Sequence, residues 1–132
     1  MEELNVIKTR QRGCETGSAV ITGAGNLNAK YVIHAVGPIY RGGSGGEANL
    51  LASAYKTSLQ LAEEHGAKTI AFPSISTGAY GYPISEAANI AIETVVAFCS
   101  DTPSKLETIR FVLFEHEAYA AFERALKRAS TK

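Results

Sequence analysis

Short apolar runs alternate along the chain with longer segments whose hydrophobic residues have helical spacing. The run at 31–36, YVIHAV, is apolar on both faces of an extended chain, which is typical of a strand buried between two layers. Apolar residues then recur every three or four positions from Leu50 to Ala62, and Gly66 is a typical helix stop. The pattern predicts a buried strand and then a helix that begins near Glu47.

The same alternation continues to the end of the chain. Residues 68–76 and 106–114 predict two more strands, and helical apolar stripes follow at 84–96 and 116–130. An earlier strand is predicted at 18–25, SAVITGAG. Strands that alternate with helices favour a sheet of parallel strands covered by helices, with right-handed crossovers.

Length and charge limit the classes of function. The chain has 132 residues, 45% of them hydrophobic and 20% charged, so we expect one domain over residues 1–132. Thirteen basic residues balance thirteen acidic ones, which leaves no overall field that would attract nucleic acid or an anionic membrane. A phosphate-bearing ligand would have to be held by local geometry.

Cysteine usage and the chain ends indicate a cytoplasmic protein. Cys14 and Cys99 have neither the spacing nor the neighbouring histidines of a metal site, and they form no disulfide framework. The first residues lack the apolar core of a signal peptide, and no apolar run is long enough to span a membrane. We expect no metal and no cofactor.

The segment PSISTGAYGYP, at 73–83, is the strongest candidate for a binding loop. It joins a predicted strand to a helix, at the carboxyl edge where parallel sheets bind ligands. Its hydroxyls, and its glycines at 78 and 81, would let backbone amides approach a phosphate at a helix N-terminus. The segment is neither a Walker A loop nor a G-x-G-x-x-G loop. A turn of small residues that caps the next helix explains the pattern equally well.

Aromatic residues and histidines allow a functional and a structural interpretation. Phe114 ends a strand and could stack on an adenine, although core packing is the commoner role there. Tyr80 could cover a sugar or a base, whereas Tyr82, which precedes a proline, is expected to pack. His34 lies inside a strand and is expected to be a hydrogen-bonded core residue, and the other two histidines are expected at the surface. No G-x-S-x-G elbow is present, so no catalytic residue is assigned.

Three segments together resemble a known family. GCETGSAVITGAGNLNAKYVIHAVGPIY, TIAFPSISTGAYGYP and IRFVLFEHEAYAAFERAL are similar, in order and spacing, to the C-terminal two-thirds of a macrodomain, the module that binds ADP-ribose. The resemblance covers about Gly13 to Leu126. It implies a three-layer α/β/α fold that lacks the N-terminal strands, with four or so strands in a mixed or parallel sheet.

The resemblance also implies a binding site. Residues 76–81 match the family's second phosphate-binding loop, whose backbone amides wrap the diphosphate and the distal ribose. Tyr80 matches the aromatic that borders this ribose, and Phe114 matches the ring that stacks on adenine. The implied ligand is ADP-ribose, free or on a modified protein, or a related nucleotide diphosphate. The implied binding residues are Ser74, Ser76, Thr77, Gly78, Ala79, Tyr80, Gly81 and Phe114.

The chain departs from the family at its N-terminus. The family's Gly-Asp-Ile-type motif, its Asn-Ala-Ala-Asn-type motif and its Gly-rich first loop have no counterpart in residues 1–132. Because the second motif and this loop carry much of the hydrolytic machinery, whether the chain is an enzyme is left open. One alternative is an ADP-ribosyl hydrolase that acts on modified protein or O-acetyl-ADP-ribose once the missing part is supplied. Another is a folded scaffold that binds nothing.

The departure also predicts a gap in the sheet. In the family, one of the missing strands lies between the strands that match 31–36 and 69–75. Unpaired backbone groups there would be costly if they were buried. The two strands could pair directly, two copies could complete each other, or a separate segment could fill the gap. Direct pairing would leave one sheet face short of a helix, and we would then expect a homodimer over that apolar face.

Overall fold

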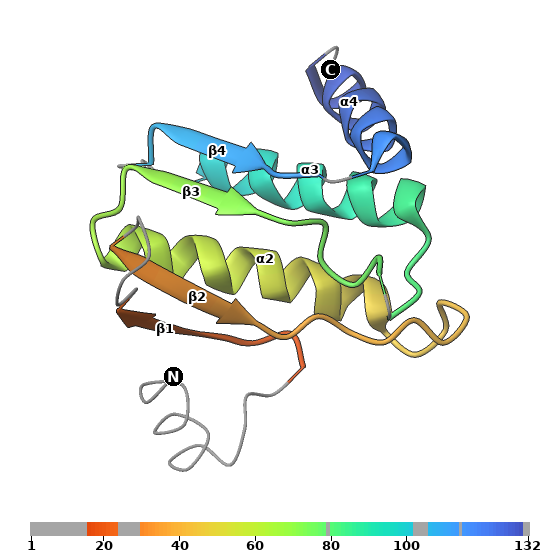
Figure 1. The fold of residues 1–132 in the computed structure, drawn as a ribbon, viewed down its shortest axis with the longest axis horizontal. Helices are drawn as coiled ribbons and strands as arrows, with labels where there is room; N and C mark the ends of the chain where they lie inside the picture. The colour runs from red at the N-terminus through yellow and green to blue at the C-terminus, as the bar shows by residue number, and fades with distance from the viewer. Residues whose placement is uncertain (1–15, 24–29, 79, 102–105, 114, 131–132) are drawn as a thin grey trace.

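The computed structural model describes residues 16–23, 30–78, 80–101, 106–113 and 115–130. Strands and helices alternate from β2 onward, as the hydrophobic spacing predicts (Figure 1). The elements in these ranges are β1 (Ala19–Gly23), β2 (Tyr31–Ala35), α2 (Glu47–Glu64), β3 (Thr69–Phe72), α3 (Ile84–Asp101), β4 (Thr108–Phe111) and α4 (His116–Ser130).

The four described strands form two separate pairs. β1 and β2 are antiparallel, with Ala19 opposite Ala35, and β3 and β4 are parallel, with Thr69 opposite Thr108. β2 and β3 point in the same direction in front of α2 (Figure 1), yet no sheet pairing joins them within the described residues. Direct pairing of these two strands, one of the three expected arrangements, is therefore wrong.

The separation of the pairs explains the exposure of β2. A strand buried between layers was predicted, but Tyr31 is exposed and the next four residues are only partly buried. Within the described residues β2 has a neighbouring strand on one edge only, so less of its surface is covered. The prediction of a fully buried strand was wrong for this reason.

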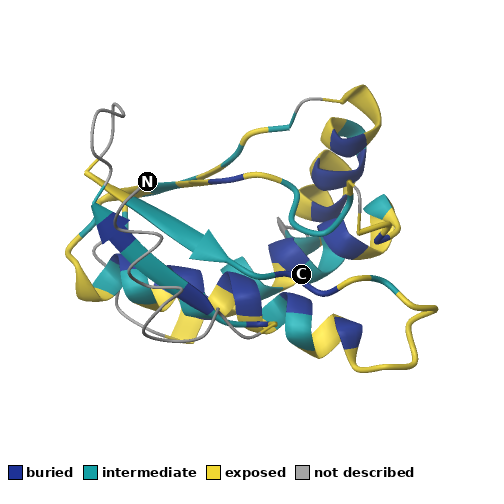
Figure 2. Ribbon diagram, turned by 60° about the horizontal axis from the view of Figure 1, so that its bottom comes forward, coloured by how far each residue is buried: buried dark blue, intermediate teal, exposed yellow. Residues whose placement is uncertain are grey.

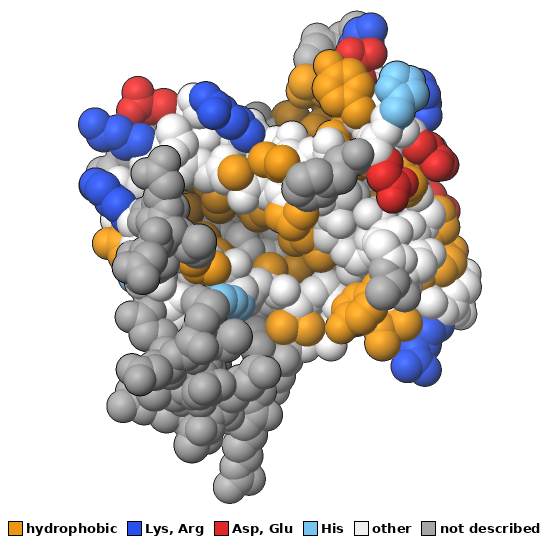
Figure 3. Space-filling model, viewed as in Figure 1, with side chains coloured by type: hydrophobic (Ala, Val, Ile, Leu, Met, Phe, Trp, Pro, Cys, Tyr) orange, Lys and Arg blue, Asp and Glu red, His pale blue; other side chains and the backbone are white. Residues whose placement is uncertain are grey.

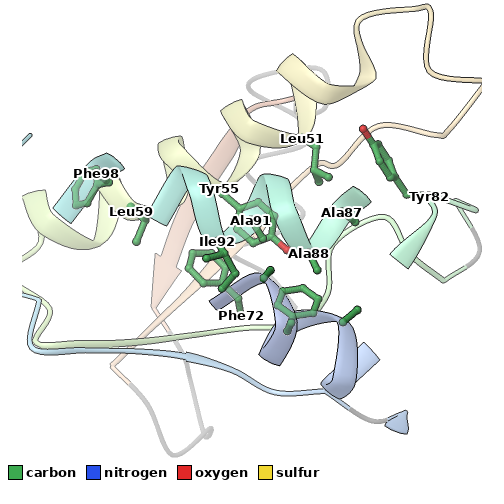
Figure 4. Packing of buried hydrophobic residues seen from close by; sticks show 13 residues of the cluster. Leu51, Tyr55, Leu59, Phe72, Tyr82, Ala87, Ala88, Ala91, Ile92 and Phe98 are labelled. Atoms are coloured by element: carbon green, nitrogen blue, oxygen red, sulfur yellow. The ribbon is translucent and has the colours of Figure 1, made fainter. Parts of the chain in front are cut away.

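The core lies between α2, α3 and the β3–β4 pair. α2 contributes Leu51, Tyr55 and Leu59, which are fully buried, and each helix carries its buried residues on one side (Figure 2). α3 faces the core with small residues at 87, 88 and 91, which allow close approach of the helices. Tyr55 lies beside Ala91 and close to Phe72 (Figure 4). A single hydrophobic cluster thus holds the helices against β3.

Aromatic rings connect the layers of this core. The ring centroid of Phe72 in β3 lies 5.1 Å from that of Tyr55 in α2 and 5.7 Å from that of Phe111 in β4. Phe111 in turn lies 4.9 Å from Phe122 of α4. Such pairs add stability beyond the area they bury. The chain of rings therefore runs from α2 through the parallel strands to the last helix.

The Tyr55 hydroxyl is a buried polar group within this core. It accepts a hydrogen bond from the Ile75 backbone N–H at 3.1 Å and lies 3.4 Å from the Pro73 carbonyl, to which it donates. Burial raises the pKa of Tyr55, so the hydroxyl stays protonated at neutral pH. α2 therefore fixes the chain just after β3, where the candidate loop begins.

Replacing Tyr55 with phenylalanine should destabilise the fold. The substitution leaves the ring in place but removes the partner of the Ile75 N–H, which we expect to cost about 1 to 3 kcal/mol. Urea denaturation gives the free energy of unfolding. Tyr119→Phe is the control, because Tyr119 is 56% exposed and its change should have little effect. Equal stability of the two variants would show that the Tyr55 hydroxyl contributes nothing.

Candidate functional site

The loops that follow β2 and β3 meet at the carboxyl ends of these strands. The Tyr40 N–H donates to the Tyr80 carbonyl at 2.9 Å, and the ring centroids of Tyr40 and Tyr82 lie 4.8 Å apart. A Cβ atom on Gly37 would overlap the side chains of Ile75 and Ser76, so only glycine allows the two loops to come so close. The edge that collects loops and helix N-termini is the expected ligand edge of an open parallel sheet.

The 74–81 loop is shaped by its own hydrogen bonds. The Thr77 hydroxyl donates to the Ser74 carbonyl at 3.1 Å, and the two side-chain oxygens lie 2.9 Å apart. The Gly81 N–H donates to the Gly78 carbonyl at 3.0 Å. These bonds within the loop give it a defined turn conformation.

Ser76 has two costly features. Among the described residues other than glycine, it alone has a positive φ, 69°, in the left-handed region that side chains disfavour. Its Oγ is buried and has no hydrogen-bond partner within the described residues. Strained backbone and unsatisfied polar groups concentrate at functional sites. Packing and hydrogen bonding within the described residues therefore do not account for the backbone conformation and the buried hydroxyl of Ser76.

The outer side of the loop is accessible. Gly78 and Gly81 are exposed, and an added Cβ would meet no atom within 4 Å at either position. Tyr80 is 43% exposed beside them. α3 begins three residues after Gly81, so the partial positive charge of its N-terminus lies close by in sequence. Exposed backbone followed by a helix N-terminus is an arrangement that accepts anions.

Tyr82 is a packing residue, as its sequence context predicts. It is only 5% exposed, and its N–H donates to the Ser76 carbonyl at 2.9 Å. Burial, and then the negative charges of Glu86 and Glu47, raise the pKa of Tyr82. The residue therefore anchors the end of the loop and stays neutral.

Glu47 organises the neighbouring loop at 37–46. Its carboxylate accepts hydrogen bonds from the backbone N–H groups of Arg41 (2.8 Å), Gly43 (2.9 Å) and Gly45 (2.6 Å). These bonds, led by those from Arg41 and Gly43, lower the pKa of Glu47 from 4.5 to about 2. Sequence reasoning found only the helix start at this residue. The sequence feature that could have indicated these hydrogen bonds is one acid directly after a glycine-rich segment.

Several predicted site residues are not brought together by the described structure. Ala79 and Phe114 lie outside the described residues, so their proposed contacts stay predictions. The chain beyond Phe114 continues into exposed Glu115 and into His116, the first residue of α4. Ser74, Ser76, Thr77, Gly78, Tyr80 and Gly81 do lie within one short loop.

The remaining histidines have structural roles. His34 Nε2 lies 3.1 Å from the Thr22 hydroxyl, which confirms a hydrogen-bonded histidine in the strand. His65 is exposed at the end of α2, and its Nδ1 donates to the Leu61 carbonyl at 2.9 Å.

In the described ranges, no group of three or more His, Cys, Asp or Glu could hold a metal ion. No described helix is long and apolar enough to cross a membrane.

Comparison with known families identifies this arrangement. The model of the Macro domain family matches residues 1–91. The chain belongs to the macro domain family. This macro domain is 59% identical over 124 residues to a macro domain-containing protein of Caldanaerobacter subterraneus subsp. tengcongensis. The match covers 94% of this chain and 70% of the relative. An O-acetyl-ADP-ribose deacetylase of Enterobacter cloacae subsp. cloacae is 48% identical over 126 residues, covering 96% and 69%.

Solved structures show the same fold. The Oceanobacillus iheyensis macrodomain with ADP superposes with a TM-score of 0.92 at 32% identity, over 98% of this chain and 69% of that one. The Trypanosoma brucei macrodomain in complex with ADP-ribose has a TM-score of 0.78 at 33% identity, over 86% and 47%. The α/β macrodomain fold predicted from the sequence is confirmed.

Glu47 predicts a pH dependence of stability. Its pKa is lower in the folded state, so it stabilises the fold above its ordinary value of 4.5, and this stabilisation is lost as the pH falls toward 2. Glu47→Gln should be less stable than the unaltered chain at about pH 6, and the difference should shrink by about pH 3. Chemical denaturation of both proteins at each pH measures it. A difference that does not change with pH would contradict the assigned role.

Proposed function

We propose that this macro domain binds ADP-ribose, free or attached to a protein, through the 74–81 loop. Ser76 carries the proposal, because its left-handed backbone and its buried hydroxyl without a partner among the described residues are costs of the kind that concentrate at binding sites. The exposed glycines leave the loop backbone open to a diphosphate. Solved relatives were obtained with ADP and with ADP-ribose, which supports this ligand class.

The proposed roles divide along the loop. Ser74, Ser76 and Thr77 supply hydroxyls, and residues 78–80 supply backbone N–H groups to the diphosphate. Gly81, whose own N–H is bonded to the Gly78 carbonyl, keeps the backbone beside them uncovered. Tyr80 is exposed beside them and covers the distal ribose. Ala79 and Phe114 are included among the proposed binding residues because of the sequence match. Ala79 would belong to the loop, and Phe114 would stack on adenine. We further propose that residues 1–132 act as a single binding unit.

A hydrolase is the second candidate function. Several relatives, including the one from Enterobacter cloacae, carry the name O-acetyl-ADP-ribose deacetylase. The proposed 74–81 binding loop would also serve such an enzyme, and no nucleophile or base is assigned among the described residues. Release of acetate from O-acetyl-ADP-ribose by the purified chain would support this candidate. Absence of turnover by a chain that binds ADP-ribose would restrict the function to binding.

Calorimetric titration tests whether the chain binds ADP-ribose. ADP-ribose should bind saturably and about ten-fold or more tighter than AMP, because AMP lacks the diphosphate and distal ribose that the loop would contact. The folded state of the sample is checked by circular dichroism. A well-folded sample that gives no heat with ADP-ribose would refute the proposed function.

Substitution of Gly78 tests whether the 74–81 loop is the binding site. Gly78→Val fits the fold, since an added Cβ meets no atom within 4 Å, so its melting temperature should change little. A ligand against the loop backbone would meet the new side chain, and affinity should fall about ten-fold or more. Ala97→Val, at an exposed position of α3, is the matched control and should bind normally. Unchanged affinity of Gly78→Val would place the ligand elsewhere.

A further inference from the structure

We propose that Glu47 is a positioning residue of the candidate site, which strengthens the binding of ADP-ribose more than that of ADP without touching either ligand. This role rests on the proposed function, because it concerns how the 74–81 loop is held for binding. A route of contacts joins the Glu47 carboxylate to Tyr80 through the loop at 37–46. Only the last step of this route involves a ligand.

Both oxygens of the Glu47 carboxylate bind the loop that precedes α2. Oε2 accepts hydrogen bonds from the N–H groups of Arg41 and Gly43, and Oε1 accepts one from the Gly45 N–H. Glu47 is only 3% exposed, so water competes little for these bonds. An acid in the first turn of a helix usually stabilises the helix end. Here the carboxylate also fixes the course of the preceding loop.

The segment 41–46 depends on these hydrogen bonds for its order. Its sequence, RGGSGG, contains no apolar side chain, and all six residues are exposed. Glycine, which fills four of the six positions, loses more conformational freedom on ordering than any other residue. Without the Glu47 carboxylate this segment would therefore sample many conformations.

The segment that Glu47 holds lies against Tyr40. A Cβ atom on Gly43 would be 3.2 Å from the Tyr40 hydroxyl oxygen, so the backbone at Gly43 passes close to the tip of this ring. The N–H of the same glycine is bonded to Glu47. The Tyr40 ring centroid also lies 4.8 Å from that of Tyr82, at the end of the 74–81 loop. Tyr40 therefore contacts both the segment that Glu47 holds and the candidate binding loop.

The last contact of the route joins Tyr40 to Tyr80. The Tyr40 N–H donates to the Tyr80 carbonyl at 2.9 Å. Figure 3 shows hydrophobic side chains at the surface in the area where Figure 1 shows these two loops. Ile39 is 48% exposed and Tyr80 is 43% exposed. The hydrogen bond therefore positions a residue whose ring a ligand can reach.

The place where the route enters the 74–81 loop decides which part of the ligand responds. Under the proposed function Tyr80 covers the distal ribose. The start of the loop is held separately, because the Tyr55 hydroxyl binds the Ile75 N–H. ADP has the diphosphate but lacks the distal ribose. Loss of the Glu47 hydrogen bonds should therefore weaken ADP-ribose binding more than ADP binding.

Glu47→Gln tests the role with a side chain of nearly the same shape. An amide has one acceptor oxygen and one NH₂ donor. If the amide oxygen takes the place of Oε2, the NH₂ group faces the Gly45 N–H, so at least one hydrogen bond is lost. In calorimetric titrations the affinity for ADP-ribose should fall about five-fold or more, and that for ADP by less than about two-fold.

A core variant separates positioning from stability. Phe98 is buried about four turns after the start of α3, away from the two loops, and Phe98→Leu should lower stability without changing the ratio of the two affinities. All proteins are titrated at a temperature at which circular dichroism shows them folded. A ratio that Glu47→Gln leaves unchanged, or that Phe98→Leu changes as much, would overturn the proposed role.

Gly45→Ala is the second variant if Glu47→Gln does not fold. It keeps the acid but places a Cβ atom 3.0 Å from the Glu47 Oε1, which displaces the carboxylate. It should change the ratio of the two affinities in the same direction as Glu47→Gln. A folded Gly45→Ala with the ratio of the unaltered chain would count against the role in the same way.

Hydrogen exchange without nucleotide tests the route itself. In Glu47→Gln the Tyr40 amide should exchange about ten-fold or more faster, whereas the Ile75 amide, which is bonded to Tyr55, should change much less. An unchanged Tyr40 amide would overturn the inference whatever the chain binds. Failure of the unaltered chain to bind ADP-ribose would refute the proposed function, and the selectivity with it. The exchange measurement would still decide whether Glu47 is linked to Tyr80, so the two failures are distinguishable.

Discussion

The packing of α2 against both strand pairs is the constraint on which the rest of the structure depends. Within the described residues no sheet pairing joins the two pairs, and this helix and the loops at one end connect them. Tyr55 is central to it, because its ring packs on Phe72 while its hydroxyl binds the chain after β3. In most sheets such a helix only covers one face, whereas here α2 also connects the two strand pairs.

The same helix organises the two loops at the candidate site. Its first residue, Glu47, gathers three backbone N–H groups of the loop after β2, and Tyr55, two turns later, holds the loop after β3. Both contacts join a buried side chain to backbone groups, so they fix the course of the chain without using the outer surface of the loops. The strained Ser76 can persist because Tyr55 holds the preceding residue, Ile75, and because the Ser76 carbonyl accepts a hydrogen bond from the Tyr82 N–H.

The sequence predicted the elements well, because buried helix faces leave a periodic apolar pattern that tertiary contacts reinforce. It also predicted that residues 74–81 form one loop, since glycines and hydroxyls at a strand end have few other uses. It did not predict the conformation of Ser76, because left-handed backbone at a serine depends on the surrounding loops. The three hydrogen bonds of Glu47 were missed for a similar reason, as they exist only once residues 41–45 fold back. The exposure of β2 was misjudged because hydrophobicity records the residues of a strand and not the presence of its neighbour.

One hydrogen bond links the behaviour of the two loops. Because the Tyr40 N–H is bonded to the Tyr80 carbonyl, fluctuations of the loop after β3 are transmitted to the loop after β2. A molecule that restricts one loop therefore restricts the other, and the second loop has less conformational entropy left to lose. Under the proposed function, residues 37–46 would therefore contribute to binding even without touching the ligand, because their motion is coupled to that of residues 74–81.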